Sequence, residues 1–336
     1  MADARRLYPD FDLTRTWTFP PALLDAHPIH ADDEPFDAYL RRLGLSNVQI
    51  EYARRSYVNA TGEAIHRLSA RAALEDMADA RFGSGDYRIV EGYDSLHQAW
   101  ARGLDIRFNT AITELGWNRA GVRAIAADGT IFDAERVVIT LPLAVLQASL
   151  RGEADVICFD PALPADKRGA IAALCMAPAV KLVYRFRQPI AAPQIAALYS
   201  ARNPPMWWSP QTGVDTDGEA VWIAFTTGDY ARELRALGEA GALAHGLNML
   251  RAELNRPDLQ PDDMRWSDWA SDPFARGGYS AVPVGATWAR AVLAQPTDGV
   301  MFWAGEATVD GAAAGTVHGA YLSGIRASRE VMSAES

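Results

Sequence analysis

The stretch from Arg136 to Leu146 constrains the fold of this chain more than any other part of its sequence. It reads RVVITLPLAVL, a run of β-branched and aliphatic residues that does not alternate with polar ones and that is interrupted at Pro142. A strand that is apolar on both faces belongs inside a parallel sheet covered by helices. A second apolar strand, VMFWAG at 300–305, enters a glycine-rich turn and precedes a closing helix at 316–332. We therefore predict an α/β fold.

The rest of the pattern adds helices and alternating strands. Residues 36–80 carry apolar positions at helical spacing, whereas 1–35 are rich in proline and aspartate and predict an extended arm. In the predicted strand at 181–186, Lys181 lies on the face opposite to Leu182. We further predict strands at 104–112 and 221–226, helices at 96–104, 166–173 and 230–254, and a hairpin at 121–130 turning at Asp128–Gly129.

Charge and cysteine content argue against several classes of protein. The formal net charge is −10, and nucleic-acid binding depends on clustered cations, so we predict no nucleic-acid partner. The two cysteines, Cys158 and Cys175, form no CxxC pattern, so we predict neither a disulfide scaffold nor a metal site. No apolar run approaches the ~20 residues of a membrane-spanning helix. Since the first residues also lack the apolar core of a signal peptide, we predict a cytoplasmic protein without a membrane anchor.

Several common catalytic and nucleotide-binding motifs are absent from the sequence. It contains no GxGxxG turn, Walker A loop, GxSxG nucleophile elbow or HExxH pair. The nearest glycine tract, GSGDYR at 83–88, lacks the third glycine and does not follow a predicted strand. His27 and His30 lie in the proline-rich arm without carboxylates at ligand spacing. No single motif therefore assigns a function.

The order of several longer segments is more informative than any motif. They are RIVEGYDSL (88–96), LDIRFNTAI (104–112), the run at 136–146, the stretch at 161–186, DPFARGGYSAVPVG (272–285), VMFWAGEAT (300–308) and GTVHGAYLSG (315–324). In this order they resemble the carboxyl-terminal two-thirds of the flavin-containing amine oxidases, within which the polyamine oxidase and lysine-demethylase-like branch is the most similar. The resemblance begins near residue 36 and is strongest from 88 onward.

The resemblance implies roles for residues that would contact an amine or the flavin ring. Lys181 matches a lysine that holds a water molecule at flavin N5 and assists reoxidation by oxygen. Tyr279 matches the aromatic residue that lines the substrate amine, and Thr316 occupies the opposite position, where many relatives have a second aromatic residue. Trp269 matches a tryptophan that packs beside the isoalloxazine, although a structural role explains a tryptophan equally well.

Further residues are implied to hold the cofactor. Gly305 and Glu306 stand at a strand end that approaches the ribityl and pyrophosphate groups. Thr316 and Val317 open the last helix, whose amino terminus would stabilise negative charge on the reduced flavin. Gly278 stands where the monoamine oxidases have the cysteine that bonds to flavin, so the implied FAD is non-covalent.

The resemblance also implies how the chain is divided. The fold would be an incomplete FAD-binding Rossmann-like domain, built from 83–160 and a closing strand and helix at 296–336, interleaved with an α+β substrate domain. That second domain would comprise the helical 36–82 and the mixed sheet and flanking helices of 161–295, with 1–35 as the arm. The strand–GxGxxG–helix unit that cradles the FAD pyrophosphate in the family is not in this sequence. A separate FAD-binding chain, or a longer form of this one, would have to supply it.

The implied activity is FAD-dependent amine oxidation. A hydride would pass from a small-molecule amine to flavin N5, the imine would hydrolyse, and oxygen would be reduced to hydrogen peroxide. The sequence leaves open a polyamine, a secondary amine or an amino acid as the substrate. The alternative is a flavin-free, non-catalytic fragment or partner subunit that retains the fold. A third hypothesis is another flavin oxidoreductase, such as a desaturase or a porphyrinogen oxidase.

Overall fold

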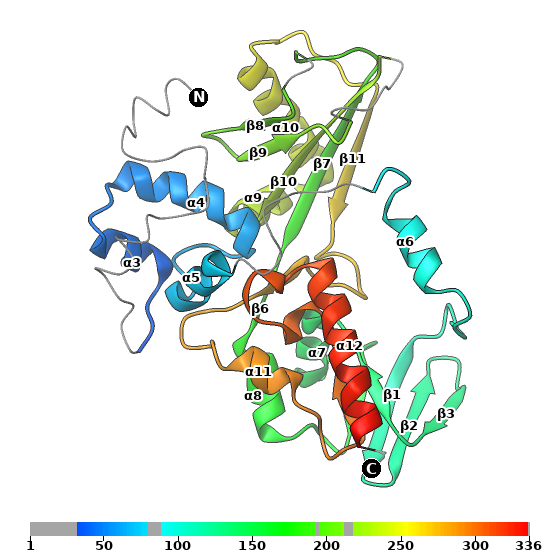
Figure 1. The fold of residues 1–336 in the computed structure, drawn as a ribbon. Coiled ribbons are helices and arrows are strands. Elements are labelled where there is room, and N and C mark those ends of the chain that lie inside the picture. Colours follow the sequence, from blue (N-terminus) through cyan, green and yellow to red (C-terminus); the bar gives the residue numbers. More distant parts are fainter. Residues whose placement is uncertain (1–31, 80–88, 193–194, 212–217, 335–336) are drawn as a thin grey trace.

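The computed structural model describes residues 32–79, 89–192, 195–211 and 218–334. The predicted proline-rich arm lies almost wholly outside these residues, and so does the glycine tract at 83–88. The described chain is a mixed α/β structure with a long sheet at one end, helices beside it, and a second group of strands and helices at the other end (Figure 1). No described helix combines the length and the apolar character that crossing a bilayer requires.

A five-stranded antiparallel sheet forms the upper part of the molecule in Figure 1. In spatial order its strands are β11 (Asp263–Asp268), β7 (Ala179–Phe186), β10 (Ala220–Thr227), β9 (Met206–Trp208) and β8 (Ala197–Tyr199). Leu182 and Tyr184 of β7 are fully buried in a core shared with α9 (Gly228–Ala236) and α10 (Gly238–Leu254). Lys181 lies on the other, half-exposed face, so the predicted alternation of this strand is confirmed.

The prediction of one continuous helix at 230–254 is wrong. The chain forms α9 and α10 instead, which meet at Leu237 and Gly238. Gly238 has a φ of +69°, a left-handed conformation that interrupts the hydrogen-bond ladder of an α-helix. The apolar spacing continues across this break, which is why the sequence pattern did not reveal it.

The amino-terminal helices α3 (Phe36–Arg42), α4 (Asn47–Thr61) and α5 (Ala70–Ala78) form a layer beside the sheet (Figure 1). In the capping box that opens α4, the Ser46 hydroxyl accepts a hydrogen bond from the Gln49 N–H, and the Gln49 side chain accepts one from the Ser46 N–H. The helical character predicted for 36–80 is confirmed for the three helices, and a turn that begins at Gly62 separates α4 from α5.

The predicted parallel strands pair with each other. Strand β4 (Val137–Ile139) lies parallel to β13 (Met301–Trp303), and both Met301 and Trp303 are buried. Around this pair lie α7 (Leu143–Leu150), α8 (Ala165–Ala173), α11 (Ala289–Ala294), α12 (Val317–Ser333), the two-stranded β6 (Cys175–Ala177) with β12 (Tyr279–Ala281), and the 3-10 turns Glu306–Thr308 and Gly311–Ala313. The prediction that helices cover both faces of the run is wrong at Val138, which is 42% exposed.

A four-stranded sheet flanks this group. Its order is β3 (Ile131–Ala134), β2 (Gly121–Ala126), β1 (Ile112–Asn118) and β5 (Cys158–Asp160), and the predicted hairpin is confirmed as β2 and β3. The predicted strand at 104–112 is wrong, because β1 begins only at Ile112. Leu104 and Phe108 are 66% and 80% exposed, and no described strand lies beside them. The predicted helix at 96–104 lies earlier, as α6 (Tyr93–Trp100).

Candidate functional site

A cavity of about 250 Å³ lies where β4 and β13 end. The two strands are parallel, and the cavity lies next to their carboxyl ends. This is the edge of an α/β sheet at which ligands bind. The residues around it come from the strand ends, from β6, from the glycine pair before β12, from α11 and from α12; they include Thr140, Leu141, Pro142, Met176, Gly277, Gly278, Leu293, Gly305, Glu306 and Ala320. The cavity therefore joins segments that lie far apart in the sequence.

Gly305 and Gly278 both line the cavity but differ in the space that an added side chain would meet. Gly305 has a φ of +122°, donates its N–H to Ser323 Oγ at 2.8 Å, and would carry a Cβ into open space. A Cβ on Gly278 would instead stand 2.4 Å from the Cβ of Ala179. The backbone at Gly305 thus leaves room for a ligand, whereas Gly278 is glycine because two chain segments touch there.

The Glu306 carboxylate lines the cavity and is engaged within the chain. It accepts hydrogen bonds from the Ser280 N–H at 3.0 Å, the Ser280 hydroxyl at 2.7 Å and the Gly315 N–H at 3.1 Å. These bonds tie β12 to the loop that leads into α12. In this structure Glu306 holds the cavity wall together.

Thr316 caps α12 beside this loop. Its hydroxyl accepts a hydrogen bond from the Gly319 N–H at 3.0 Å and donates one to the Ala313 carbonyl at 2.6 Å. The first helical residue is Val317, and the helix amino terminus carries roughly half a positive charge. The structure thus places Thr316 and Val317 at a helix end that favours negative charge.

Replacing Thr316 with valine is expected to lower the free energy of unfolding by about 1 kcal/mol, the usual cost of losing an amino-terminal cap. Valine keeps the shape of threonine but leaves the Gly319 N–H without its acceptor. Urea unfolding of the two proteins measures the difference. A matched control is Ser328→Ala within the same helix, because that hydroxyl donates to the Ile325 carbonyl and caps no N–H. Equal losses in both variants would contradict the capping role.

Tyr279 is fixed on several sides. Its hydroxyl donates to the Asn59 carbonyl at 2.5 Å, and burial raises the pKa of the phenol well above its usual value. The ring lies against Gly62 and Gly315, where an added Cβ would come within 2.7 Å and 3.0 Å of ring carbons. The ring therefore has little freedom to rotate or shift.

Lys181 is one of only two lysines in a chain with 32 lysine and arginine residues. Its ammonium lies 5.6 Å from the ring centre of Phe225 and 6.0 Å from that of Trp208, and burial lowers its pKa. No carboxylate in the described residues is within ion-pair distance of it. Lys181 is therefore a half-buried cation beside two aromatic rings, which pack edge to face against each other.

The other lysine has a structural role. Lys167 is buried, and its ammonium donates to the carbonyls of Val292, Leu293 and Gln295 at 2.9, 2.9 and 2.6 Å. These carbonyls belong to the last turn of α11, where a cation is favourable. Nearly all basic residues of this chain are arginines. The two exceptions, Lys167 and Lys181, could therefore have been singled out from the sequence.

The structure brings the predicted site residues together only in part. Of the residues predicted to contact the amine or the cofactor, Gly305 and Glu306 line the cavity, whereas Lys181, Tyr279, Thr316 and Val317 are not part of its lining. Tyr279 is linked to the neighbour of Lys181 through Asn59, whose side-chain amide donates to the Phe225 carbonyl. Trp269 follows β11, is 49% exposed and does not line the cavity. Sequence reasoning missed Asn59, because no pattern marks a single polar residue near a helix end.

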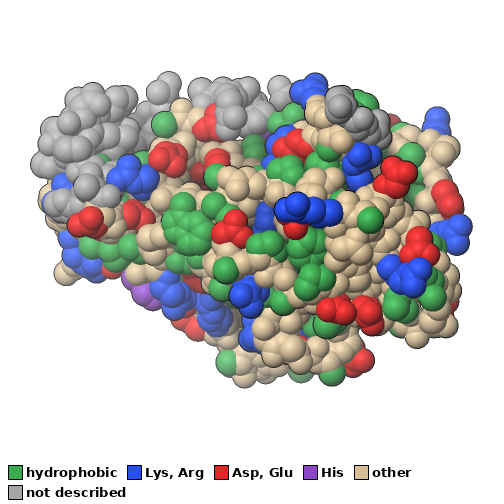
Figure 2. Space-filling view, turned by 90° about the horizontal axis from the view of Figure 1, so that it is seen from below, with side chains coloured by type: hydrophobic (Ala, Val, Ile, Leu, Met, Phe, Trp, Pro, Cys, Tyr) green, Lys and Arg blue, Asp and Glu red, His purple; other side chains and the backbone are tan. Residues whose placement is uncertain are grey.

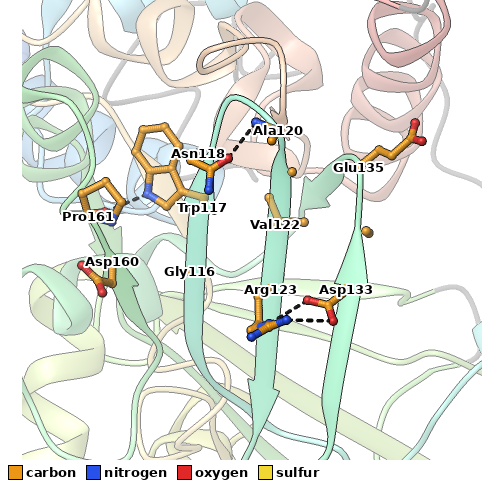
Figure 3. Close-up of a pocket in the computed structure, with 12 residues that line it drawn as sticks. Gly116, Trp117, Asn118, Ala120, Val122, Arg123, Asp133, Glu135, Asp160 and Pro161 are labelled. Atoms are coloured by element: carbon orange, nitrogen blue, oxygen red, sulfur yellow. Dashed lines mark hydrogen bonds and ion pairs between the residues drawn. The ribbon is translucent and has the colours of Figure 1, made fainter.

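A larger hollow of about 770 Å³ lies elsewhere, on the sheet of β1 to β3 (Figure 3). Trp117 donates its indole N–H to the Pro161 carbonyl at 2.7 Å, and the Arg123 guanidinium binds the Asp133 carboxylate at 2.7 Å. This pairing leaves Arg123 and Asp133 engaged with each other, and none of the predicted site residues lies there. Despite its size, we do not assign the chemistry to this hollow.

The family assignment comes from comparison with known proteins. The model of the family described as flavin containing amine oxidoreductase matches residues 24–332. The chain belongs to this family. The resemblance predicted from the sequence is thereby confirmed.

Individual amine oxidoreductases show the same relationship. The chain is 27% identical to mouse lysine-specific histone demethylase 1B, covering 95% of this chain and 40% of that protein, and 34% identical to rice polyamine oxidase 4, covering 72% and 48%. Among solved structures, the cyclohexylamine oxidase of Brevibacterium oxydans matches with a TM-score of 0.76 at 18% identity, covering 96% of this chain and 71% of that one. A putrescine oxidase variant matches with a TM-score of 0.75 at 19% identity, covering 94% and 70%. The chain thus spans less than half the length of these curated relatives.

The cavity of this amine oxidoreductase fits part of an FAD molecule. The open backbone at Gly305 and the strand ends beneath it suit a flat ring system. Ala320, in the first turn of α12, also lines the cavity, so the capped amino terminus of this helix lies near enough to favour negative charge gained on reduction. The sequence contains no GxGxxG turn, the motif that cradles a dinucleotide pyrophosphate. The described residues at the cavity therefore fit the flavin end of the cofactor.

Proposed function

We propose that this chain is the flavin-facing and amine-binding portion of an FAD-dependent amine oxidase. The observation that carries the proposal is the cavity at the ends of β4 and β13, where the open backbone of Gly305 faces the glycine pair before β12. In the proposed division, 83–160 and 296–336 belong to the cofactor domain, and 36–82 and 161–295 belong to the substrate domain. FAD, when bound, supplies the hydride acceptor.

The residues of the chain would bind and polarise the reactants. Tyr279 presents a fixed aromatic face, which suits an amine that approaches as a cation. Lys181 contributes a positive charge where oxygen is reduced, and the amino terminus of α12 at Val317 favours the anionic reduced cofactor. Thr316 and Glu306 hold the loop before α12 in place, while Trp269 would pack beside the cofactor at the rim. Because Gly278 leaves no cysteine for attachment, the FAD would be non-covalent.

The substrate class follows from the relatives. The polyamine oxidase, the putrescine oxidase, the cyclohexylamine oxidase and the lysine-specific histone demethylase are each named for a compound or residue that carries an amino group. We therefore propose a small-molecule amine, oxidised with formation of hydrogen peroxide. On the face seen in Figure 2, acidic and basic side chains are interspersed, so neither sign forms a continuous field for a polyanionic or polycationic partner.

The FAD pyrophosphate would be held by a polypeptide outside these 336 residues. Large apolar side chains are exposed on three parts of the cofactor region: α6 with the residues on either side of it, β4, and α12. Trp100 of α6 stacks on Tyr321 of α12 with 4.9 Å between ring centres. The exposed residues are Val90, Tyr93, Trp100, Leu104, Ile106, Phe108, Val138, Val317, Tyr321 and Leu322. Exposed apolar surface of this extent is typical of a binding face, and the alternation at 104–108 suits an added strand.

Titration with FAD tests this proposal. The purified chain is expected to stay colourless with micromolar FAD, because the half of the site that holds the phosphates is absent. Adding the portion of rice polyamine oxidase 4 that this chain does not match is expected to give a yellow protein that releases hydrogen peroxide with an amine. Visible absorbance and a peroxidase-coupled assay measure the two outcomes.

The same titration decides between the two candidate functions. The absence of a glycine-rich turn favours the second candidate, a flavin-free partner subunit that keeps the fold. A protein that remains colourless after complementation, and that makes no peroxide with polyamines, secondary amines or amino acids, would establish that reading instead. A chain that becomes yellow with FAD alone would contradict the need for a complementing polypeptide.

A further inference from the structure

Asn59 acts in the structure as a substitute for a strand residue. Strand β9 pairs with β10 only as far as Met206 opposite Phe225. Just past this point the Asn59 side chain donates its Nδ2–H to the Phe225 carbonyl at 2.9 Å and accepts from the Thr227 N–H at 3.1 Å. A carboxamide has the donor and acceptor of a peptide group. Asn59 therefore continues the ladder of β10 from helix α4.

The main chain of the same residue holds the tyrosine. The Asn59 carbonyl accepts the Tyr279 hydroxyl hydrogen at 2.5 Å. The ring of Tyr279 cannot follow a shift of this carbonyl by rotating, because Gly62 and Gly315 touch it. A movement of Asn59 would therefore move the phenol or break its hydrogen bond.

The side chain of the same residue reaches the lysine. Phe225 lies opposite Lys181 in the ladder between β10 and β7, and the ring centre is 5.6 Å from the ammonium nitrogen. The conformation of the last residues of β10 therefore sets where the aromatic neighbour of Lys181 stands. Asn59 contacts both the strand that carries this neighbour and the hydroxyl of Tyr279.

We infer that Asn59 is a positioning residue that sets the spacing between Tyr279 and the Lys181–Phe225 pair, and thereby the fit of the amine. This inference rests on the proposed function. Under this inference, Asn59 of α4 determines how Tyr279 of β12 and Lys181 of β7 are placed relative to each other. Loss of the carboxamide would remove its hydrogen bonds to the Phe225 carbonyl and the Thr227 N–H at a partly buried position.

Acylation of Lys181 can be followed specifically, because the chain contains only two lysines. N-hydroxysuccinimide acetate acylates free amino groups, and mass spectrometry of peptides separates Lys181 from the buried Lys167 and from the amino terminus. In Asn59→Leu, Lys181 is expected to react at least threefold faster, because Phe225 no longer stands in a fixed place beside it. Asn59→Asp keeps the acceptor for Thr227, so a smaller increase is expected and the variant remains informative if the leucine variant does not fold.

A second amide provides the matched control. The Gln211 side chain accepts from the Val221 N–H at 2.6 Å, at the opposite end of β10. Gln211→Leu is expected to leave the acylation rate of Lys181 unchanged. In the complemented holoenzyme, Asn59→Asp is expected to raise KM for the amine about tenfold with kcat within twofold, whereas Gln211→Leu changes neither.

The outcomes separate this inference from the proposed function. If the wild-type protein oxidises no amine, the proposed function fails, and the acylation rates still decide whether Asn59 controls the surroundings of Lys181. If both Asn59 variants acylate at the wild-type rate, or if Gln211→Leu shows the same increase, Asn59 is a general clamp of the fold and the inference is overturned.

Discussion

Replacing Lys181 with methionine is expected to slow the reaction of the reduced holoenzyme with oxygen about 100-fold. Oxygen gains negative charge as it is reduced, and an ammonium in a half-buried site stabilises that charge far more than one in water. Methionine keeps the length and the apolar stem of lysine without the charge, so it isolates the electrostatic contribution. Stopped-flow absorbance after anaerobic reduction by the amine measures the rate.

The second lysine is the control for this prediction. Lys167→Met makes the same chemical change at a cation that binds the carbonyls at the end of α11. It is expected to lower thermal stability and to leave the oxygen reaction within twofold of the wild-type rate. Lys181→Arg keeps a charge and is expected to lie between wild type and Lys181→Met. Equal oxygen rates in wild type and Lys181→Met would rule out the proposed role of the ammonium.

The sequence predicted the strands in which the order of apolar and polar residues matches which side chains are buried. The unbroken run at 136–146 predicted a parallel strand, and β4 pairs in parallel with β13. The alternation at 181–186 predicted the two faces of β7, because side chains on a strand point alternately to either side. The local pattern and the tertiary environment agree along β7, and they agree in β4 except at Val138.

The sequence failed where a partner decides the structure. The segment at 104–112 alternates like a strand, but alternation stabilises a strand only when a neighbour completes the ladder and one face is buried. The described chain provides neither, and Leu104 and Phe108 remain exposed. The same reasoning applies to Val138, whose open face on β4 could not be read from its apolar neighbours.

The site shows the same limit at the level of single side chains. The family resemblance placed Glu306 and Tyr279, but not what their polar atoms bind. The bonds from Ser280 to the Glu306 carboxylate and the contact between Tyr279 and Asn59 join different elements, and the bond from Gly315 spans a loop. Such contacts leave no periodic pattern, because each involves a single residue and a partner fixed only by the fold.

A buried carboxylate next to this site is expected to dominate the acid sensitivity of the fold. Glu63 lies in the turn after α4 with a side chain only 1% exposed. It accepts hydrogen bonds from the Ala64 N–H at 2.7 Å, from Arg67 at 2.8 Å, and from Arg232 of α9 at 2.9 and 2.6 Å. Burial alone would raise the pKa of this carboxyl, but the hydrogen bonds from Arg232, Arg67 and Ala64 outweigh it and lower the pKa to about 2.

Glu63→Gln is therefore expected to lower the free energy of unfolding by about 3 kcal/mol at pH 7. The carboxyl has a reference pKa of 4.5, so the folded state binds its proton less readily than the unfolded chain does. Its stabilising contribution is fully present above pH 4.5 and is lost as the pH falls toward 2. The difference between wild type and variant is expected to shrink accordingly when urea unfolding is measured at pH 7, 4 and 3.

Asp229 supplies the comparison that makes this result specific. Its carboxylate binds the same two arginines, at 2.6 Å from Arg67 and 3.1 Å from Arg232, but its side chain is 29% exposed. Water screens such a pair, so Asp229→Asn is expected to cost less than about 1 kcal/mol. If Asp229→Asn destabilises the protein as much as Glu63→Gln does, the arginines themselves, and not the burial of the Glu63 charge, control the stability of the contact between the turn after α4 and helix α9.

This contact matters for function because Gly62, the residue before Glu63, packs against Tyr279. A loosened Glu63 is therefore expected to weaken amine binding at the same acidic pH at which stability falls.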